Sequence, residues 1–120
     1  MARENFSSGS KWEPILGYSR AVKAGPYVHV SGTTGPGDTA PEQARAALEI
    51  IKGALEKAGA RLDQVVRTRV YVTDISQWEA IGKVHGDYFG QVKPAMAMVE
   101  VSKLIDPALF VEIEADAYLG

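Results

Sequence analysis

Apolar residues recur along two stretches of the chain at the spacing of an amphipathic helix. The first stretch runs from Ala44 to Ala58, where alanine, leucine and isoleucine share one helical stripe. Thr39 and Glu42 precede it with the spacing of a capping box, and Gly59 follows it as a stop signal. The pattern predicts a helix that starts after Thr39 and ends at Gly59.

A second helical stripe extends from Trp78 to Tyr88. Ser76 and Glu79 repeat the capping-box spacing at its start, and Gly90 follows its end. This pattern predicts a second helix directly after a β-branched stretch.

The remaining regular stretches alternate or are rich in β-branched residues, which predicts strands. They cover residues 19–24, 27–31, 65–73, 95–101 and 109–118. A Gly-Pro step makes the first two a hairpin. The predicted order is ββαβαββ, in one domain over residues 17–120. Residues 1–16 are assigned to an N-terminal arm. Its Trp12, Ile15 and Leu16 are more apolar than a free tail requires, so we expect this segment to pack onto another surface.

Two amphipathic helices and one sheet fit an α+β two-layer sandwich with both helices on one face. Alternation assigns to the helix-facing side Val66, Thr68, Val70, Val72, Ala97, Val99, Val101, Val111, Ile113, Ala115 and Ala117. The opposite side then carries Arg67, Arg69, Tyr71, Met96, Met98, Glu100, Phe110, Glu112, Glu114 and Asp116. This second set mixes large apolar groups with opposite charges. We expect it to form a subunit interface with a polar pocket, in a symmetric homo-oligomer.

Composition narrows the classes of function. The 120 residues contain no cysteine, which excludes disulfides, thiolate catalysis and cysteine-ligated metals. The 13 Lys and Arg are mixed with 15 Asp and Glu and form no basic stripe, so a nucleic-acid partner is not expected. No apolar run reaches the ~18 residues of a membrane span, and the N-terminus has no signal-peptide pattern. We expect a cytoplasmic protein without membrane association.

Three carboxylates on the last strand are the densest chemical signal. Glu112, Glu114 and Asp116 alternate, so their side chains line up on one face. Cross-strand pairing with Arg67 and Arg69 would account for one or two of them. A carboxylate left partly buried beside an apolar wall would have a raised pKa and could orient or deprotonate water.

Other patterns predict less chemistry. Gly32, Gly35 and Gly37 lie between a strand and a helix, but their spacing matches no phosphate-binding loop and favours a turn. His29 and His85 could serve as acid and base for RNA cleavage, although structural roles are the commoner outcome. Their spacing gives no indication of a zinc site, and we predict no metal.

Several separated motifs resemble one family. GYSRAVKAGPYVHVSG, the helix after PEQ, VVRTRVYVTDI, PAMAMVEVSKL and VEIEADA occur in the order found in the Rid (reactive intermediate deaminase) superfamily, also called YjgF-like or L-PSP endoribonuclease-like proteins. The resemblance spans residues 17–117. It implies a chorismate-mutase-like sandwich that forms a homotrimer with ligand clefts between subunits. Its best-known members hydrolyse 2-imino and 2-enamino acids to 2-keto acids without metal or cofactor, and some are described as ribonucleases or translation inhibitors.

The resemblance also implies roles for individual residues. Tyr18 matches the family's cleft tyrosine, Ser31 and Gly32 match its SG pair, and Ala95 matches a residue of the cleft wall. Glu112 matches the glutamate that handles the hydrolytic water. We therefore expect these five positions to lie around one cleft.

One departure from the family motif bears on the substrate. An arginine that grips the substrate carboxylate follows Pro-Ala in the deaminases, whereas Met96 stands there in this chain. Loss of such a charge-assisted hydrogen bond costs about 1.5 to 3 kcal/mol, which weakens binding of an imino acid by roughly ten- to a hundredfold or more. The chain thus resembles the arginine-lacking branches. Met98 and Met96 would make the pocket floor apolar and favour an uncharged or aromatic ligand. Arg20 either supplies a substitute cation or pairs with Glu114 or an acid of a neighbouring subunit.

Three functions follow as hypotheses. The first is a cofactor-independent hydrolase of deaminase type, in which Glu112 positions water and the cleft binds a small imine, enamine or carbonyl compound. The second is a non-catalytic protein that binds or senses a small metabolite. The third, an endoribonuclease, is the weakest because of the acidic charge balance.

Overall fold

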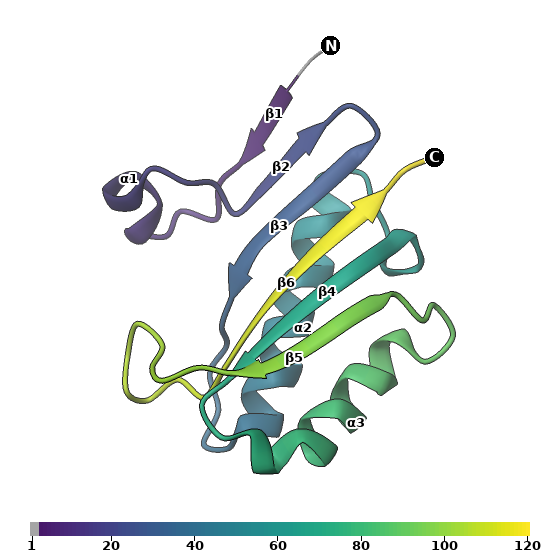
Figure 1. Ribbon diagram of the computed structural model, residues 1–120. Coiled ribbons are helices and arrows are strands. Elements are labelled where there is room, and N and C mark those ends of the chain that lie inside the picture. The colour runs from purple at the N-terminus through teal and green to yellow at the C-terminus, as the bar shows by residue number, and fades with distance from the viewer. Residues whose placement is uncertain (1–2) are drawn as a thin grey trace.

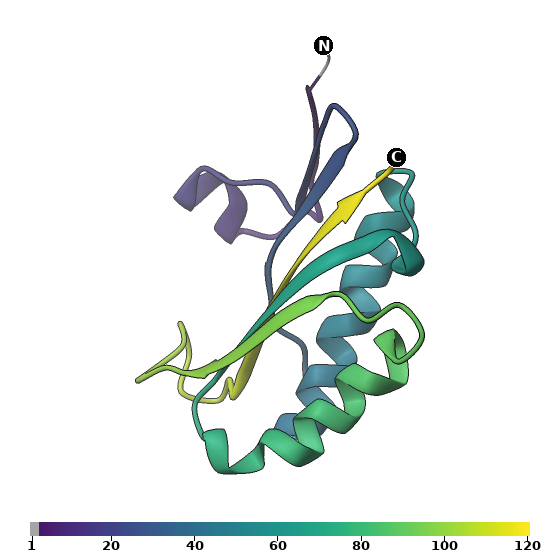
Figure 2. The ribbon, with the colours of Figure 1, turned by 45° about the vertical axis from the view of Figure 1, so that its right-hand side comes forward.

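The structure, a computed structural model, describes residues 3–120 as one six-stranded sheet covered on one face by two long helices (Figures 1 and 2). The strands are β1 (Arg3–Phe6), β2 (Ala21–Ala24), β3 (Tyr27–Thr33), β4 (Val65–Val72), β5 (Ala95–Glu100) and β6 (Val111–Tyr118). The helices are α1 (Trp12–Leu16), α2 (Ala40–Lys57) and α3 (Trp78–Phe89). The predicted ββαβαββ core and the two-layer α+β sandwich are confirmed.

The strands lie in the order β1-β2-β3-β6-β4-β5. All neighbours are antiparallel except β4 and β5, whose parallel pairing is made possible by the crossover through α3. The segment assigned to an arm contributes β1, which pairs with β2 from Arg3↔Ala24 to Phe6↔Ala21, and the short helix α1. Neither element was predicted, because the Arg-Glu-Asn-Phe of β1 shows no apolar alternation and α1 has only 5 residues, too few for a helical stripe.

The two helix starts differ from each other in how they are capped. Thr39 caps α2 as predicted: its hydroxyl accepts from the Glu42 N–H, and the Glu42 carboxylate accepts from the Thr39 N–H at 3.1 Å. The predicted capping box of Ser76 and Glu79 is wrong. Asp74 instead accepts the Ser76 N–H at 3.0 Å and begins a single 3₁₀ turn, after which α3 starts at Trp78.

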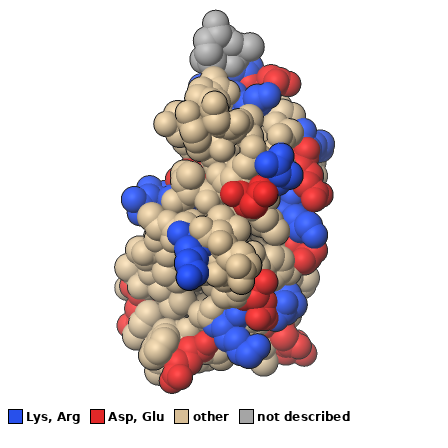
Figure 3. Space-filling model, turned by 90° about the vertical axis from the view of Figure 1, so that its right-hand side faces the viewer, with Lys and Arg blue, Asp and Glu red and all other residues tan. Residues whose placement is uncertain are grey.

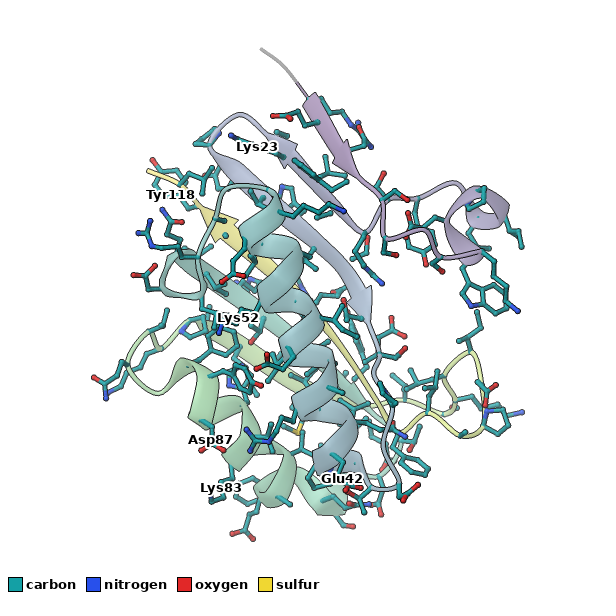
Figure 4. The ribbon with its side chains drawn as sticks, turned by 180° about the vertical axis from the view of Figure 1, so that it is seen from behind. Lys23, Glu42, Lys52, Lys83, Asp87 and Tyr118 are labelled. Carbon is teal, nitrogen blue, oxygen red and sulfur yellow. The ribbon has the colours of Figure 1, made fainter. Side chains whose placement is uncertain are left out.

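Charged side chains cover the outer surface of the helical layer. Lys83 and Asp87 on α3 lie one turn apart, with Nζ and Oδ1 3.8 Å from each other, and Arg45 of α2 reaches the same Asp87 at 2.8 Å. Lys83, Asp87 and Lys52 are labelled on this layer in Figure 4. On the side drawn in Figure 3, charges of both signs are interspersed and no basic stripe appears.

The predicted faces hold for β6 and for most of β4. Val111, Ile113, Ala115 and Ala117 are buried under the helices, and the carboxylates between them lie on the open face. Val66 is an exception, 46% exposed, because the β4–β6 register shifts between Val65 and Arg67 and buries Val65 instead. Phe110 also departs from its prediction, because it precedes the strand and packs against the core.

The predicted faces of β5 are wrong. In the parallel register Met96 lies beside Thr68 and Met98 beside Val70, so both methionines share the helix-facing side. Ala97 and Val99, assigned to the core, are exposed. The reason is that β5 is an edge strand whose two sides are both largely apolar, so alternation carried no information about which side was buried.

Candidate functional site

A cleft of about 780 Å³ opens on the sheet face away from α2 and α3. One wall is α1 and the other is the loop of residues 101–110 before β6; both project from the side of the sheet opposite the long helices (Figure 2). Tyr18, Arg20, Ser31, Gly32 and Glu112 all line this cleft. The structure therefore brings together five of the predicted site residues within a single chain.

Glu112 differs from the two carboxylates that follow it on β6. The Tyr71 hydroxyl donates to Glu114 at 2.9 Å, and Asp116 lies 3.2 Å from the Arg69 guanidinium and 2.7 Å from His29 Nδ1. Among residues 3–120, no side chain donates a hydrogen bond to the Glu112 carboxylate. Cross-strand pairing thus accounts for two of the three carboxylates and leaves Glu112 available for chemistry.

The surroundings of Glu112 favour its protonated form. Burial raises the pKa of Glu112 above its ordinary value, and the charge of Glu114 raises it further, while Arg20 acts in the opposite direction. A carboxyl group with a raised pKa on the floor of a cleft is a stronger base than an ordinary glutamate, so it can accept a proton from water and return it to a bound ligand. The geometry therefore suits Glu112 to general acid–base chemistry.

The backbone at Ser31 and Gly32 makes room for this carboxylate. The pairing of β3 with β6 shifts register between Val30 and Thr33, which places a bulge at these two residues. A Cβ atom at Gly32 would lie 2.1 Å from Oε2 of Glu112. The close approach of backbone and carboxylate therefore requires glycine at this position.

Arg20 binds this bulge and not Glu114. Its guanidinium donates to the Gly32 carbonyl at 2.5 Å and lies 5.9 Å from the centroid of the Tyr18 ring. Its Nε is buried and has no hydrogen-bond partner among residues 3–120. Arg20 thus places a positive charge in the cleft, on the same side as Tyr18.

A buried carboxylate anchors the α1 wall of the cleft. Glu13 is only 5% exposed and accepts hydrogen bonds from the Ser8 N–H, at 3.1 Å, and from the Ser8 hydroxyl. The bond from the Ser8 hydroxyl holds the pKa of Glu13 below its ordinary value. Gly17 ends the helix with φ 76°, and its N–H donates to the Glu13 carbonyl at 2.8 Å. These bonds fix α1 beside Tyr18.

A buried glutamine anchors the opposite wall. Gln43 of α2 is 2% exposed, and its side-chain amide donates to the carbonyls of Ala108, at 2.8 Å, and Gly37, at 3.1 Å. Its side-chain oxygen accepts the Phe110 N–H at 2.8 Å. One side chain thus ties the loop of residues 101–110 to the first turn of α2.

We expect Gln43→Ala to lower the free energy of unfolding by about 2 to 4 kcal/mol, because the Phe110 N–H and the Ala108 and Gly37 carbonyls lose their partner. Denaturant unfolding followed by circular dichroism measures this change. Gln91→Ala removes an exposed glutamine and should stay within about 0.5 kcal/mol of wild type. Equal stability of the two variants would contradict the anchoring role.

The remaining predicted site residues lie elsewhere in the single chain. Met96 and Met98 line a second cavity, of about 640 Å³, with Trp78 between β5 and α3. Ala95 is exposed at the start of β5. None of these three lines the cleft that holds Glu112.

The two histidines are far from forming a catalytic pair. His29 contacts Asp116 on the open face, whereas His85 Nε2 lies 2.8 Å from the Thr68 hydroxyl between sheet and α3. Burial lowers the pKa of His85 below its ordinary value. Neither histidine lines the cleft, and among residues 3–120 no group of three His, Asp or Glu side chains could hold a metal ion.

Four large apolar residues of the cleft were not predicted as site residues. Trp12 and Leu16 come from α1, and Ile105 and Leu109 come from the opposite loop. The apolar character of residues 12–16 was the available signal for α1. The loop has no periodicity from which its contribution could be read.

Comparisons with known proteins agree with this fold. The family model for Endoribonuclease L-PSP matches residues 9–119. A RutC family protein of Pyrococcus abyssi is 39% identical, over 98% of this chain and 98% of its own. The crystal structure of Rv2704 from Mycobacterium tuberculosis, described as a member of the YjgF/YER057c/UK114 family, has a TM-score of 0.96 at 57% identity and covers 98% of this chain and 99% of its own.

A more distant structure supports the same assignment. NMB1025 of Neisseria meningitidis, described as a member of the YjgF protein family, has a TM-score of 0.86 at 28% identity, over 98% of this chain and 95% of its own. Within residues 3–120 no helix is long and apolar enough to span a bilayer. Since the family model covers nearly the whole sequence and the structures superpose over the same extent, the chain belongs to the Endoribonuclease L-PSP family, the group also named YjgF, RutC and UK114.

Proposed function

We propose that this protein is a homotrimer whose clefts bind a small imine, enamine or carbonyl metabolite, and that Glu112 directs water onto it. Family membership supports a small-molecule-binding or deaminase-type role. The observation that carries the proposal is the position of Glu112, half-buried in a cleft without a side-chain partner, while its neighbours on β6 are paired. Tyr18 and the Ser31–Gly32 backbone line the same cleft and would fix the ligand.

Assembly would complete the site. Arg67, Arg69 and Val99 are exposed on the open face of the sheet, a mixture of charge and apolar surface that suits contact with another subunit. Ala95, Met96 and Met98 could then join the cleft only from a neighbouring subunit. The cleft is accordingly expected to form between two chains.

The proposed chemistry is hydrolysis. Glu112 removes a proton from water as the oxygen attacks the imine carbon, and passes this proton to the imine nitrogen, which gives a tetrahedral adduct with one hydroxyl and one amino group. Glu112 then takes the hydroxyl proton and gives it to the amino nitrogen as the C–N bond breaks, so that ammonia leaves and the carbonyl product remains. Water supplies the new oxygen, and no cofactor takes part. Arg20, on the Tyr18 side of the cleft, would provide a cation for an anionic group of the substrate.

A non-catalytic binding protein is the second candidate, and Met96 is the observation that favours it. Without the family's arginine at this position, a 2-imino acid loses a charge-assisted hydrogen bond. A cleft that binds a metabolite without turning it over would still need Tyr18, Ser31 and the apolar walls.

Ammonia release from freshly generated 2-iminopropionate separates the two candidates. For a hydrolase we expect turnover by the wild type, and for Met96→Arg a rate raised by roughly ten- to a hundredfold at low substrate. No wild-type turnover together with gain of turnover in Met96→Arg would support the binding role instead. The same preparations should scatter light as a particle of three 12.9 kDa chains. A stable monomer would contradict the proposed shared cleft.

A further inference from the structure

We infer that the cleft selects ligands that carry a bulky apolar substituent, aromatic or branched aliphatic, beside the reacting carbonyl or imine group. This inference rests on the proposed function and names the class of its substrate. The structural basis is the set of large apolar side chains on the two walls of the cleft. The floor is polar, and each wall carries large apolar residues together with one polar residue, Ser10 on the α1 side and Asp106 on the loop.

The first wall presents Trp12 and Leu16 of α1. These residues are four positions apart, so they share one side of the helix, and both line the cleft. They are 41% and 63% exposed in the single chain. Ile15 on the same short helix is 68% exposed but does not line the cleft. Only one side of α1 therefore lines the cleft, although the helix is exposed on other sides as well.

The second wall presents Ile105 and Leu109 of the loop before β6. Ile105 is 62% exposed although it is a large aliphatic residue, and both residues line the same cleft as Trp12. Exposed apolar side chains on two facing walls are removed from water only when an apolar group packs between them. A ligand whose substituent lies between Trp12 and Ile105 would bury both.

The floor fixes the orientation of such a ligand. Glu112 of β6 and Ser31 of β3 lie on the sheet that forms the floor, and Arg20 binds the Gly32 carbonyl beside them, so a carbonyl or imine group would be activated there. The substituent is then directed outward, between the walls. Buried Glu13 and Gln43 hold the two walls in place without any ligand, so the space is formed in advance.

Calorimetric titration with two 2-keto acids tests the inference. Phenylpyruvate and pyruvate share the keto acid group, so the ratio of their affinities isolates the effect of the apolar substituent. We expect the wild type to bind phenylpyruvate roughly tenfold or more tightly than pyruvate. Trp12→Ala should abolish this preference, because it should lower the affinity for phenylpyruvate much more than the affinity for pyruvate.

Two further variants keep the test independent of any single wall. Ile105→Ser alters the opposite wall and should reduce the same preference, even if truncation at Trp12 disturbs α1. Ile15→Ala removes an equally exposed residue outside the cleft and should retain the wild-type ratio.

The inference is wrong if the wild type binds the two acids with equal affinity, or if both wall variants keep the preference for phenylpyruvate. Neither result would contradict the proposed function. An Ile15→Ala variant that loses the preference and changes the particle mass would also overturn the inference, because α1 would then pack on a second copy of the chain. Failure of both acids to bind overturns the inference as well. The ammonia-release assay, which requires no product binding, shows separately whether the proposed function fails.

Discussion

Glu112→Gln should lower the rate of imine hydrolysis by about a hundredfold to ten thousandfold, the usual contribution of a positioned general acid–base group. Glutamine keeps the shape of the side chain but cannot accept the proton of the attacking water. Tyr18, Ser31 and the cleft walls are untouched, so the KM for the same substrate should change little. Glu56→Gln, at an exposed position on α2, is the matched control and should keep wild-type activity.

The same variant should be at least as stable as the wild type at neutral pH. The folded pKa of Glu112 is raised, so its contribution to stability is fully present below the unfolded pKa and is lost as pH rises through the folded pKa. Glutamine cannot ionise and avoids that loss. Denaturant unfolding at neutral pH and at a pH below the ordinary glutamate pKa of 4.5 would reveal the difference. A glutamine variant that is less stable at neutral pH would contradict the desolvated position of this carboxyl.

The pH dependence of turnover gives an independent readout of the same group. If Glu112 acts as the base, the rate should rise with pH through the raised pKa of its carboxyl, above the range of an ordinary glutamate. The residual activity of Glu112→Gln should lack this rise. A wild-type profile that is flat through the raised pKa of Glu112 would assign the proton transfer to another group.

Gly32→Ala should reduce turnover by about a hundredfold or more while changing the free energy of unfolding by no more than about 1 kcal/mol. The added Cβ would lie 2.1 Å from Oε2, 3.0 Å from Cδ and 3.3 Å from Cγ of Glu112. Because these atoms form the flexible end of a side chain, the carboxylate can rotate away and the strand need not move. The protein would then remain folded, with the proposed general base displaced.

A second glycine provides the control for Gly32→Ala. Gly53 lies inside α2, and nothing lies within 4 Å of a Cβ built on it. Gly53→Ala should therefore raise stability by about 0.5 to 1 kcal/mol through helix propensity and leave turnover unchanged. Steady-state kinetics together with denaturant unfolding of both variants measure the contrast. Full activity in Gly32→Ala would show that the carboxylate position is not critical.

Local patterns were sufficient to predict the sandwich. The helical stripe and the Thr39–Glu42 capping box defined α2, and strict alternation defined β6, which is flanked by a strand on each side and buried on one face only. Glu112 could be selected as a chemical candidate for the same reason. On β6 the position of a residue in the sequence determines the face on which its side chain lies.

The edges of the sheet could not be predicted in this way. Met96 and Met98 were assigned to the wrong face, because both faces of β5 carry apolar residues at the margin of the helical layer. Strand β1 was not predicted, because it is stabilised by pairing with β2 and has no apolar pattern of its own. Ile105 lines the cleft because of the course of the loop before β6. That course depends on the hydrogen bonds of Gln43 to Ala108 and Phe110, which lie 65 and 67 positions further along the chain.

The hydrogen bonds of Gln43 couple the start of α2 to the loop before β6, which lies far from it in the sequence. Gln43 follows directly after Glu42, the residue that closes the capping box of α2. Fraying of the first helical turn would thus withdraw the support of the Ala108–Phe110 backbone and let Ile105 drift from Trp12. The width of the cleft entrance therefore depends on the end of a helix on the opposite side of the sheet, and sequence changes there could alter the residence time of the proposed ligand without touching it.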